Sequence, residues 1–149
     1  MRVCLVCSSG GHFTELYRLH DAWRDHDRFW VTFDSPDTRS LLAGEQVLFA
    51  ASPTNRDLCN LLRNLVLAWR VLGRERPAAM ISTGAGVAVP FLLAARLRGV
   101  PTIYVESLSR VHTLSLTGRA AYRLADEFLV QWPELAARLP HARYAGRVL

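Results

Sequence analysis

Residues 1–15 read MRVCLVCSSGGHFTE, and this stretch decides the fold. Residues 3–7 are all apolar and too few for a helix, so they predict a strand that is buried on both faces. The turn letters SSGG come next. After them, apolar residues recur at the spacing of an amphipathic helix, at Leu16, Leu19, Ala22 and Trp23. A strand, a glycine turn and a helix at the start of a chain indicate a doubly wound α/β domain.

The glycine turn has two interpretations. Gly10 and Gly11 let the backbone approach a ligand closely, and the N–H groups that begin the helix behind them attract an anion. His12 then stands at the mouth of the turn, where its side chain can reach a substrate. In the other interpretation the glycines only make a tight turn, and residues 8–12 alone leave both open.

The composition is that of a globular protein with an acidic partner. Its 149 residues predict one domain, 1–149, and a content of 50% hydrophobic and 21% charged residues excludes a disordered chain. The net charge is +5, and all 18 basic residues are arginine. Arginine favours phosphate and anionic surfaces, although a coding bias also explains the absence of lysine. The positive balance favours phosphate, anionic lipid or nucleic acid as a partner.

The three cysteines provide no disulfide framework. Cys4 and Cys7 would point to opposite faces of the first strand, which predicts core residues and argues against a redox or metal pair. No segment resembles a signal peptide, and none has the ~20 apolar residues needed to cross a bilayer. We therefore expect the protein in the cytosol or on the cytosolic face of a membrane.

Strands and helices alternate along the rest of the chain. The further predicted strands are residues 28–33, 47–50, 79–82, 102–106, 127–131 and 142–144. The further predicted helices are residues 38–42, 57–73, 89–97, 116–124 and 133–139. This alternation implies a mostly parallel, Rossmann-like sheet, in which ligands lie beyond the carboxyl ends of the strands. Three polar loops fall at that edge, residues 8–12, 82–86 and 106–112.

The loop Gly84-Ala85-Gly86 is a near match to the dinucleotide fingerprint G-x-G-x-x-G, with Val89 at the third glycine. Glu106 follows about 20 residues later, near the place of the ribose-binding acid. A stand-alone nucleotide-binding protein or oxidoreductase is therefore one hypothesis. Against it, the fingerprint belongs after the first strand, and the glycines also suit close packing of a helix on the sheet.

Glu106 ends an apolar strand, where a carboxylate can bind a sugar hydroxyl or act as a general base. A helix cap or an ion pair with Arg110 is the alternative. His12, Glu15 and His112 would complete a metal-ligand set with Glu106. No pair of them has metal-ligand spacing on one element, so no metal site is expected.

The long helix 57–73 mixes arginine with apolar residues. The face expected to cover the sheet consists of Leu58, Leu61, Leu62, Leu65, Trp69 and Leu72. Arginines share the opposite face, at Arg56, Arg63, Arg70 and Arg74, and Leu67 and Val71 lie among them. Such a mixture suits the headgroup region of an anionic membrane. The predicted membrane contacts are Arg63, Leu67, Arg70, Val71 and Arg74. A core helix with a solvated basic face is the alternative.

Four motifs occur in order along the chain: SSGGHxxEL, STGAGVAVP, YVESLSRV and YAGRVL, starting at Ser8, Ser82, Tyr104 and Tyr144. Together they resemble the membrane-anchoring subunit of the two-component N-acetylglucosaminyltransferase of dolichol-linked oligosaccharide synthesis. They resemble more closely its bacterial relatives in exopolysaccharide and capsule assembly. The resemblance covers essentially the whole chain.

The resemblance implies the N-terminal, acceptor-side half of a GT-B glycosyltransferase, similar to the enzyme that adds N-acetylglucosamine to lipid-linked peptidoglycan precursor. A separate donor-binding subunit would hold most of the nucleotide-sugar, so no cofactor is expected on this chain alone. The pair would transfer a sugar to a polyprenyl-diphosphate-linked glycan at the cytosolic face of the cell membrane. Nucleic acid is not an expected partner under this resemblance.

The resemblance also implies roles for single residues. His12 would be the general base on the acceptor hydroxyl, and Glu106 would be the second catalytic residue. The substrate-binding residues would be Ser9, Gly10, Gly11, Gly84, Gly86 and Arg110. The partner interface would be Tyr144, Gly146, Val148 and Leu149. The eukaryotic subunit carries an N-terminal membrane anchor that we do not find here. Membrane attachment is therefore expected to rest on helix 57–73 or on the partner, and catalysis on a partner that supplies the donor half.

Overall fold

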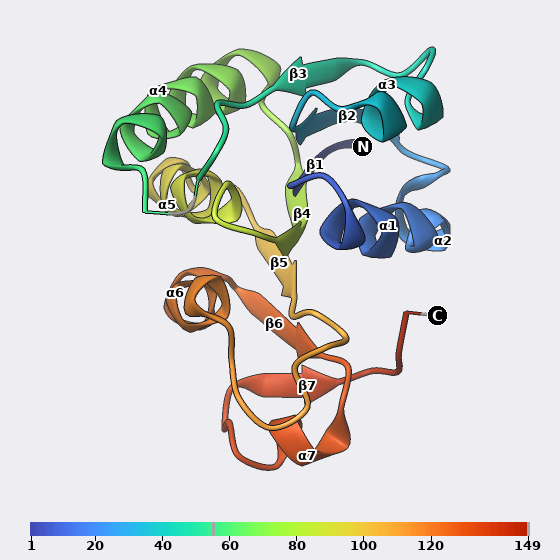
Figure 1. Ribbon diagram of the computed structural model, residues 1–149, viewed down its shortest axis with the longest axis vertical. Coiled ribbons are helices and arrows are strands. Elements are labelled where there is room, and N and C mark those ends of the chain that lie inside the picture. Colours follow the sequence, from blue (N-terminus) through green and yellow to red (C-terminus); the bar gives the residue numbers. More distant parts are fainter. Residues whose placement is uncertain (55, 149) are drawn as a thin grey trace.

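The computed structural model describes residues 1–54 and 56–148. In this part of the chain, seven strands form one parallel sheet in the order β3-β2-β1-β4-β5-β6-β7 (Figure 1). The strands are β1 (Arg2–Cys7), β2 (Asp27–Thr32), β3 (Val47–Phe49), β4 (Ala79–Gly84), β5 (Thr102–Val105), β6 (Glu127–Val130) and β7 (Ala142–Tyr144). The helices are α1 (Gly11–Arg18), α2 (His20–Trp23), α3 (Pro36–Leu41), α4 (Leu58–Glu75), α5 (Ala88–Arg98), α6 (Leu116–Leu124) and α7 (Pro133–Ala136). The predicted doubly wound α/β fold is confirmed.

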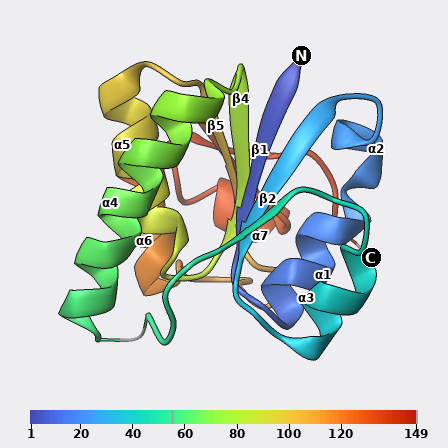
Figure 2. The ribbon, with the colours of Figure 1, turned by 90° about the horizontal axis from the view of Figure 1, so that it is seen from above.

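Helices cover both faces of the sheet. Figure 2 shows α1, α2 and α3 on one face and α4, α5 and α6 on the other. Strand β1 lies inside the sheet, between β2 and β4, and its side chains alternate between the two cores. Cys4 and Val6 belong to the core under α4 and α5, whereas Leu5 and Cys7 belong to the core under α1. Residues 3–7 are therefore buried on both faces, and the two cysteines point to opposite sides, as predicted.

The predicted first helix is broken at Leu19, which separates α1 from α2. The indole of Trp23 donates a hydrogen bond of 3.0 Å to the carbonyl of Leu16. In a continuous helix that carbonyl would accept from the backbone of residue 20. Trp23 is buried by this turn, while Ala22 faces solvent, so the prediction that placed both on one apolar face was wrong for Ala22.

The α4 helix turns a different face to the core than its leucines predict. Its buried residues are Asn60, Asn64, Ala68, Val71 and Leu72. Of the face expected to cover the sheet, Leu58, Leu61, Leu62 and Trp69 are exposed. Val71 is only 3% exposed, and Leu67 packs against the core, so the prediction of these two residues as membrane contacts was wrong.

Two buried asparagines account for the orientation of α4. The Asn64 amide accepts from Ala51 N at 2.8 Å and donates to Ala51 O at 3.0 Å. The Asn60 amide donates to Pro53 O at 2.8 Å. Buried polar groups require hydrogen-bond partners, and the loop before the helix supplies them. The asparagine face therefore turns inward, and the leucine face turns outward.

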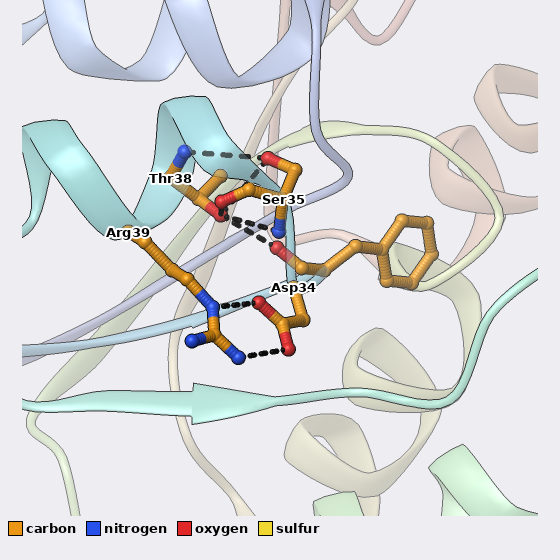
Figure 3. A network of polar contacts seen from close by, with 5 residues as sticks. Asp34, Ser35, Thr38 and Arg39 are labelled. Atoms are coloured by element: carbon orange, nitrogen blue, oxygen red, sulfur yellow. Dashed lines mark hydrogen bonds and ion pairs between the residues drawn. The ribbon is translucent and has the colours of Figure 1, made fainter.

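The α3 helix begins at a capping box (Figure 3). The Ser35 hydroxyl accepts from Thr38 N at 3.2 Å, and the Thr38 hydroxyl accepts from Ser35 N at 3.1 Å. Arg39 pairs with Asp34 just before the cap, and its hydrogen bond to that carboxylate lowers the pKa of Asp34. These contacts end β2 and return the chain toward β3.

Candidate functional site

Three loops meet at the carboxyl edge of the sheet. They follow β1, β4 and β5, which are neighbouring strands, and they correspond to residues 8–12, 84–86 and 106–112. The chain leaves β1 for β2 on one side and reaches β4 on the other, so the edge beside β1 is the topological switch point of the sheet. Ligands of open α/β sheets bind at such a point.

His12 lies in the first turn of α1 with one ring nitrogen already engaged. Its Nδ1 lies 2.8 Å from the carbonyl oxygen of Thr83. The Thr83 hydroxyl donates in return to the His12 carbonyl at 2.6 Å. Because a carbonyl only accepts, the Nδ1 atom must carry the proton, and the neutral ring then has its lone pair on Nε2. That nitrogen has the state that a general base requires.

The glycines after β4 let other groups approach closely. Gly84 has a φ of +104°, and a Cβ there would lie 3.1 Å from His12 Nδ1 and 3.2 Å from the Tyr104 hydroxyl. A Cβ on Gly86 would lie 2.8 Å from the hydroxyl of Thr54, which precedes α4. Both glycines therefore have packing reasons of their own. Thr54 therefore also lies beside the site, although no sequence motif points to it.

The turn before α1 leaves open space. Gly10 is the N-cap of α1 with a φ of +77°, and no side chain caps the helix there. A Cβ at Gly10 or Gly11 would meet no atom within 4 Å, and Ser9 beside them is half-buried. Unpaired N–H groups at the start of a helix, with space in front of them, suit a phosphate.

Glu106 is buried, being only 1% exposed, and its carboxylate is engaged on both oxygens. Oε1 accepts from Ser107 N, and Oε2 accepts from Ser115 N, each at 3.0 Å. The Ser115 hydroxyl donates to the same carboxylate and accepts from Gly118 N at 2.8 Å, which caps α6. This geometry favours a positioning role for Glu106 over the predicted catalytic one, and it matches the helix-cap alternative.

Gly118 and Tyr104 complete this buried group. A Cβ on Gly118 would lie 2.8 Å from Glu106 Cδ and 2.9 Å from the Ser115 hydroxyl, so the helix needs glycine where the carboxylate sits. Burial raises the pKa of the Tyr104 hydroxyl, and the charge of Glu106 raises it further. Tyr104 therefore keeps its proton, and its hydroxyl lies beside Gly84.

The loop after β5 is anchored by Glu15 of α1, a residue that the sequence did not place in the site. Glu15 Oε1 accepts from Leu108 N at 3.1 Å. Arg110 is exposed in the same loop, where its backbone N–H donates to Ser107 O at 3.0 Å. Glu15 belongs to the SSGGHxxEL motif, and that position was the available signal. No group of three His, Cys, Asp or Glu side chains suited to a metal occurs among the described residues.

The C-terminal segment, residues 144–148, continues from β7 along this edge. Tyr144 and Gly146 are exposed, and Val148 N donates to the buried Gln131 side chain at 2.8 Å. Leu149, the last predicted interface residue, lies outside the described residues. Because the same Gln131 side chain bonds Glu106 O, the segment lies close to the loop after β5.

The exposed face of α4 joins α5 to form an apolar groove. Its volume is about 330 Å³, and its lining is Leu65, Val66, Trp69, Arg70, Leu93 and Leu97. The guanidinium of Arg98 lies 3.9 Å above the Trp69 ring. The predicted contacts Arg63, Arg70 and Arg74 are all exposed on α4, and Arg70 lines the groove. Among the described residues, no helix combines the length and apolarity needed to cross a membrane.

Solved structures of similar fold are about twice as long. The chain matches the crystal structure of Acinetobacter baumannii MurG with a TM-score of 0.79 and 18% identity, over 98% of this chain and 45% of that one. It matches UDP-N-acetylglucosamine 2-epimerase from Rickettsia bellii with a TM-score of 0.75 and 13% identity, over 99% and 45%. The chain therefore spans less than half of these proteins. The likeness agrees with a Rossmann-like fold equivalent to one half of a GT-B glycosyltransferase.

Sequence relatives identify the family. The human UDP-N-acetylglucosamine transferase subunit ALG14 is 28% identical over 183 residues, which span 100% of this chain and 83% of that protein. A family model described as "Oligosaccharide biosynthesis protein Alg14 like" matches residues 50–148, more than half of the chain. The chain therefore belongs to the Alg14-like family of oligosaccharide biosynthesis proteins.

Proposed function

We propose that this chain is the acceptor-binding subunit of a two-component glycosyltransferase, which transfers a sugar from a nucleotide-sugar to a polyprenyl-diphosphate-linked acceptor. The single observation that carries the proposal is the state of His12. Its Nδ1 is tied to Thr83 O at 2.8 Å, which leaves Nε2 as a base at the switch point of the sheet. Family membership supports the same reaction class, since the human relative is named as a transferase subunit.

In the proposed transfer step, each site residue has a separate role. The N–H groups around Ser9, Gly10 and Gly11 hold the acceptor diphosphate, and Arg110 neutralises part of its charge. His12 Nε2 takes the proton of the acceptor hydroxyl while that oxygen bonds to the anomeric carbon of the donor sugar. The bond from that carbon to the nucleotide diphosphate breaks, and the diphosphate leaves with the bonding electrons.

The donor would bind mainly to a partner subunit. The human relative is named as a transferase subunit, and residues 144–148 of this chain offer exposed groups for docking beside the loop after β5. We place the complex in polysaccharide biosynthesis, in the bacterial exopolysaccharide and capsule branch. The human relative named above is eukaryotic, so this branch rests on the four motifs alone.

The nucleotide-binding alternative has less support. A ribose-binding acid must present a free carboxylate to the ligand. The Glu106 carboxylate is instead buried and already accepts from Ser107 and Ser115. Gly86 packs against Thr54. Glu106 and Gly86, which suggested a dinucleotide site, therefore both have structural roles.

We further propose that the protein binds peripherally to the cytosolic face of the cell membrane through the groove between α4 and α5. Half-buried and exposed apolar side chains line it, together with Arg70, and Arg98 lies over the Trp69 ring at its border. An apolar strip with arginines at its border suits a surface of anionic lipid, because the side chains enter the acyl boundary while the guanidinium groups contact phosphate. Leu67 and Val71 have no part in this surface.

The reaction is tested by sugar transfer from UDP-N-acetylglucosamine to a polyprenyl-diphosphate-linked acceptor. We expect transfer from the reconstituted pair and none from either subunit alone. His12→Asn keeps a donor for Thr83 O but has no base, so turnover should fall by about 10²-fold or more. His20→Asn, on an exposed helix surface, is the matched control. Full transfer by this chain alone would contradict the two-subunit proposal, and unchanged turnover in His12→Asn would indicate a non-catalytic scaffold.

A further inference from the structure

The buried side chain of Gln131 connects three segments, which are the residue after β5, helix α1 and the C-terminal segment. It directly follows β6 and is 1% exposed. Its Nε2 donates to Glu106 O at 3.0 Å and lies 3.5 Å from Glu15 Oε2. Its Oε1 accepts from Val148 N at 2.8 Å. The amide is oriented without ambiguity, because acceptors surround its nitrogen and a donor faces its oxygen.

Trp132 forms a second connection between the same segments. Its indole N–H donates to Leu108 O at 2.6 Å, and the guanidinium of Arg147 lies 4.1 Å above its ring. Leu108 is therefore held on both sides, since its N–H donates to Glu15 at 3.1 Å. In these contacts, the consecutive residues Gln131 and Trp132 link residues 147 and 148 to the loop after β5.

The C-terminal segment is held at points and not along its length. A cavity of about 210 Å³ separates it from the ends of β5 and β6. Its lining comes from Leu19, Val105, Leu129, Val130, Gln131 and residues 145–148. A segment above such a space can shift without breaking a packed core.

We propose that Gln131 and Trp132 are positioning residues that couple the C-terminal segment, residues 144–148, to the acceptor loop, residues 107–110. Docking of a donor-binding subunit on the segment tightens the contacts of Val148 and Arg147, and the two side chains transmit this order to Leu108. The acceptor loop is then fully formed only when the donor half is present. The inference rests on the proposed function for the roles of the two segments, while the coupling can be measured without any transfer.

Amide hydrogen exchange of residues 106–113 in the full chain tests the coupling. Val148→Pro removes the N–H that Gln131 accepts, and Gln131→Met removes the amide itself. We expect Val148→Pro to speed exchange of this loop by about fivefold, the effect of one lost hydrogen bond. Gln131→Met, which also loses the bond to Glu106 O, should speed it more. In the double variant the effects should not add, because both substitutions break one connection. Arg147→Ala should loosen the loop through Trp132.

Tyr144→Ala is the matched control, because this exposed residue lies in the same segment, whereas the contacts to Gln131 and Trp132 come from Val148 and Arg147. In the Tyr144→Ala variant, residues 106–113 should exchange as in the wild type. Unchanged exchange in Val148→Pro and Arg147→Ala overturns the coupling, as does an additive double variant. Val148→Pro keeps the test valid if Gln131→Met does not fold.

The partner supplies the second readout. Added donor-binding subunit should protect residues 106–113 in the wild type, and Gln131→Met should bind the partner equally but lose this protection. In the reconstituted pair, Gln131→Met should raise the acceptor KM more than it lowers kcat. Equal protection in wild type and variant contradicts the coupling. Loop coupling in the variants together with no transfer by the pair would instead refute only the proposed function.

Discussion

Gly118 is the third residue of α6, where most side chains would be tolerated on a solvent face. Here the position is buried, and the Glu106 carboxylate fills the space that a Cβ would need. The same carboxylate accepts from Ser115, whose hydroxyl caps the helix at Gly118 N. Glycine, serine and glutamate at these positions therefore form one unit, in which each residue depends on the other two.

We predict that Gly118→Ala destabilises the protein by about 3 kcal/mol, because the buried carboxylate must move and lose charge-assisted hydrogen bonds. Urea unfolding measures the change. Gly11→Ala is the matched control at the start of α1, where a Cβ meets open space, and its effect should stay below about 1 kcal/mol. Equal effects of the two substitutions would show that helical glycine, and not the carboxylate, determines the cost.

At the residue scale, the sequence predicts a site residue when its side-chain chemistry suits the reaction and it also directly follows a strand. His12 and the glycines follow strands of one sheet, so their meeting at one edge could be expected. The role of Glu106 could not be read in this way, because its cap partner Ser115 lies nine residues further along the chain. Gln131 was equally hidden, since a polar residue after a strand does not reveal contacts 116 residues away.

At the scale of elements, α4 shows how a correct helix can have a wrongly assigned face. Counting leucines places the apolar side on the sheet, but Asn60 and Asn64 bind the backbone of the preceding loop. Buried hydrogen bonds to a neighbouring loop leave no trace in hydrophobic periodicity. The leucines of this helix are then available for a surface function.

We predict that Leu62→Glu and Trp69→Glu weaken binding to vesicles of anionic lipid by about tenfold or more. Trp69 lines the groove, and Leu62 is exposed on α4 one helical turn before Val66, which also lines it. Sedimentation of the full chain with vesicles measures this. Leu41→Glu, at an exposed leucine of α3 on the other face of the sheet, should bind as the wild type.

Val71→Glu separates the two faces of α4. Val71 is 3% exposed in the core, so a charge there should destabilise the fold by more than about 3 kcal/mol. Wild-type vesicle binding by both Leu62→Glu and Trp69→Glu would exclude this face as the membrane contact. A fully stable Val71→Glu variant would contradict the observed orientation of the helix.

The burial of β1 predicts the reactivity of the cysteines. Burial raises the pKa of the Cys4 thiol and raises that of Cys7 to about 12, whereas Cys59 is exposed on α4. At pH 8 a thiol reagent should label Cys59 rapidly, and Cys4 and Cys7 only after unfolding. Since their folded pKa values are raised, the free energy of unfolding should also fall as pH rises from about 9 toward 12.

Rapid labelling of all three thiols in the folded protein would contradict the burial of β1. The control for the alkaline fall in stability is Cys4→Ala with Cys7→Ala, which should flatten it. A fall of the same size in this variant would assign the pH dependence to other groups.

At the scale of the whole molecule, alternation of strands and helices predicts the sheet and the edge that carries the site. Most predicted boundaries lie within two residues of the observed ones. The break at Leu19 and the early end of α7 at Ala136 were not expected. The break at Leu19 arises because the Trp23 indole takes the Leu16 carbonyl. After Ala136 the backbone continues in tighter turns, with Arg138 N bonded to Leu135 O and Leu139 N to Ala136 O.

The interior place of β1, between β2 and β4, has a consequence for synthesis. β1 is complete at residue 7, and its neighbour β2 follows soon after, but its other neighbour β4 ends at Gly84. At about 5–20 residues per second, the ribosome leaves one edge of this apolar strand unpaired for several seconds. Chaperone supply during translation should therefore govern the yield of folded protein more than refolding conditions afterwards.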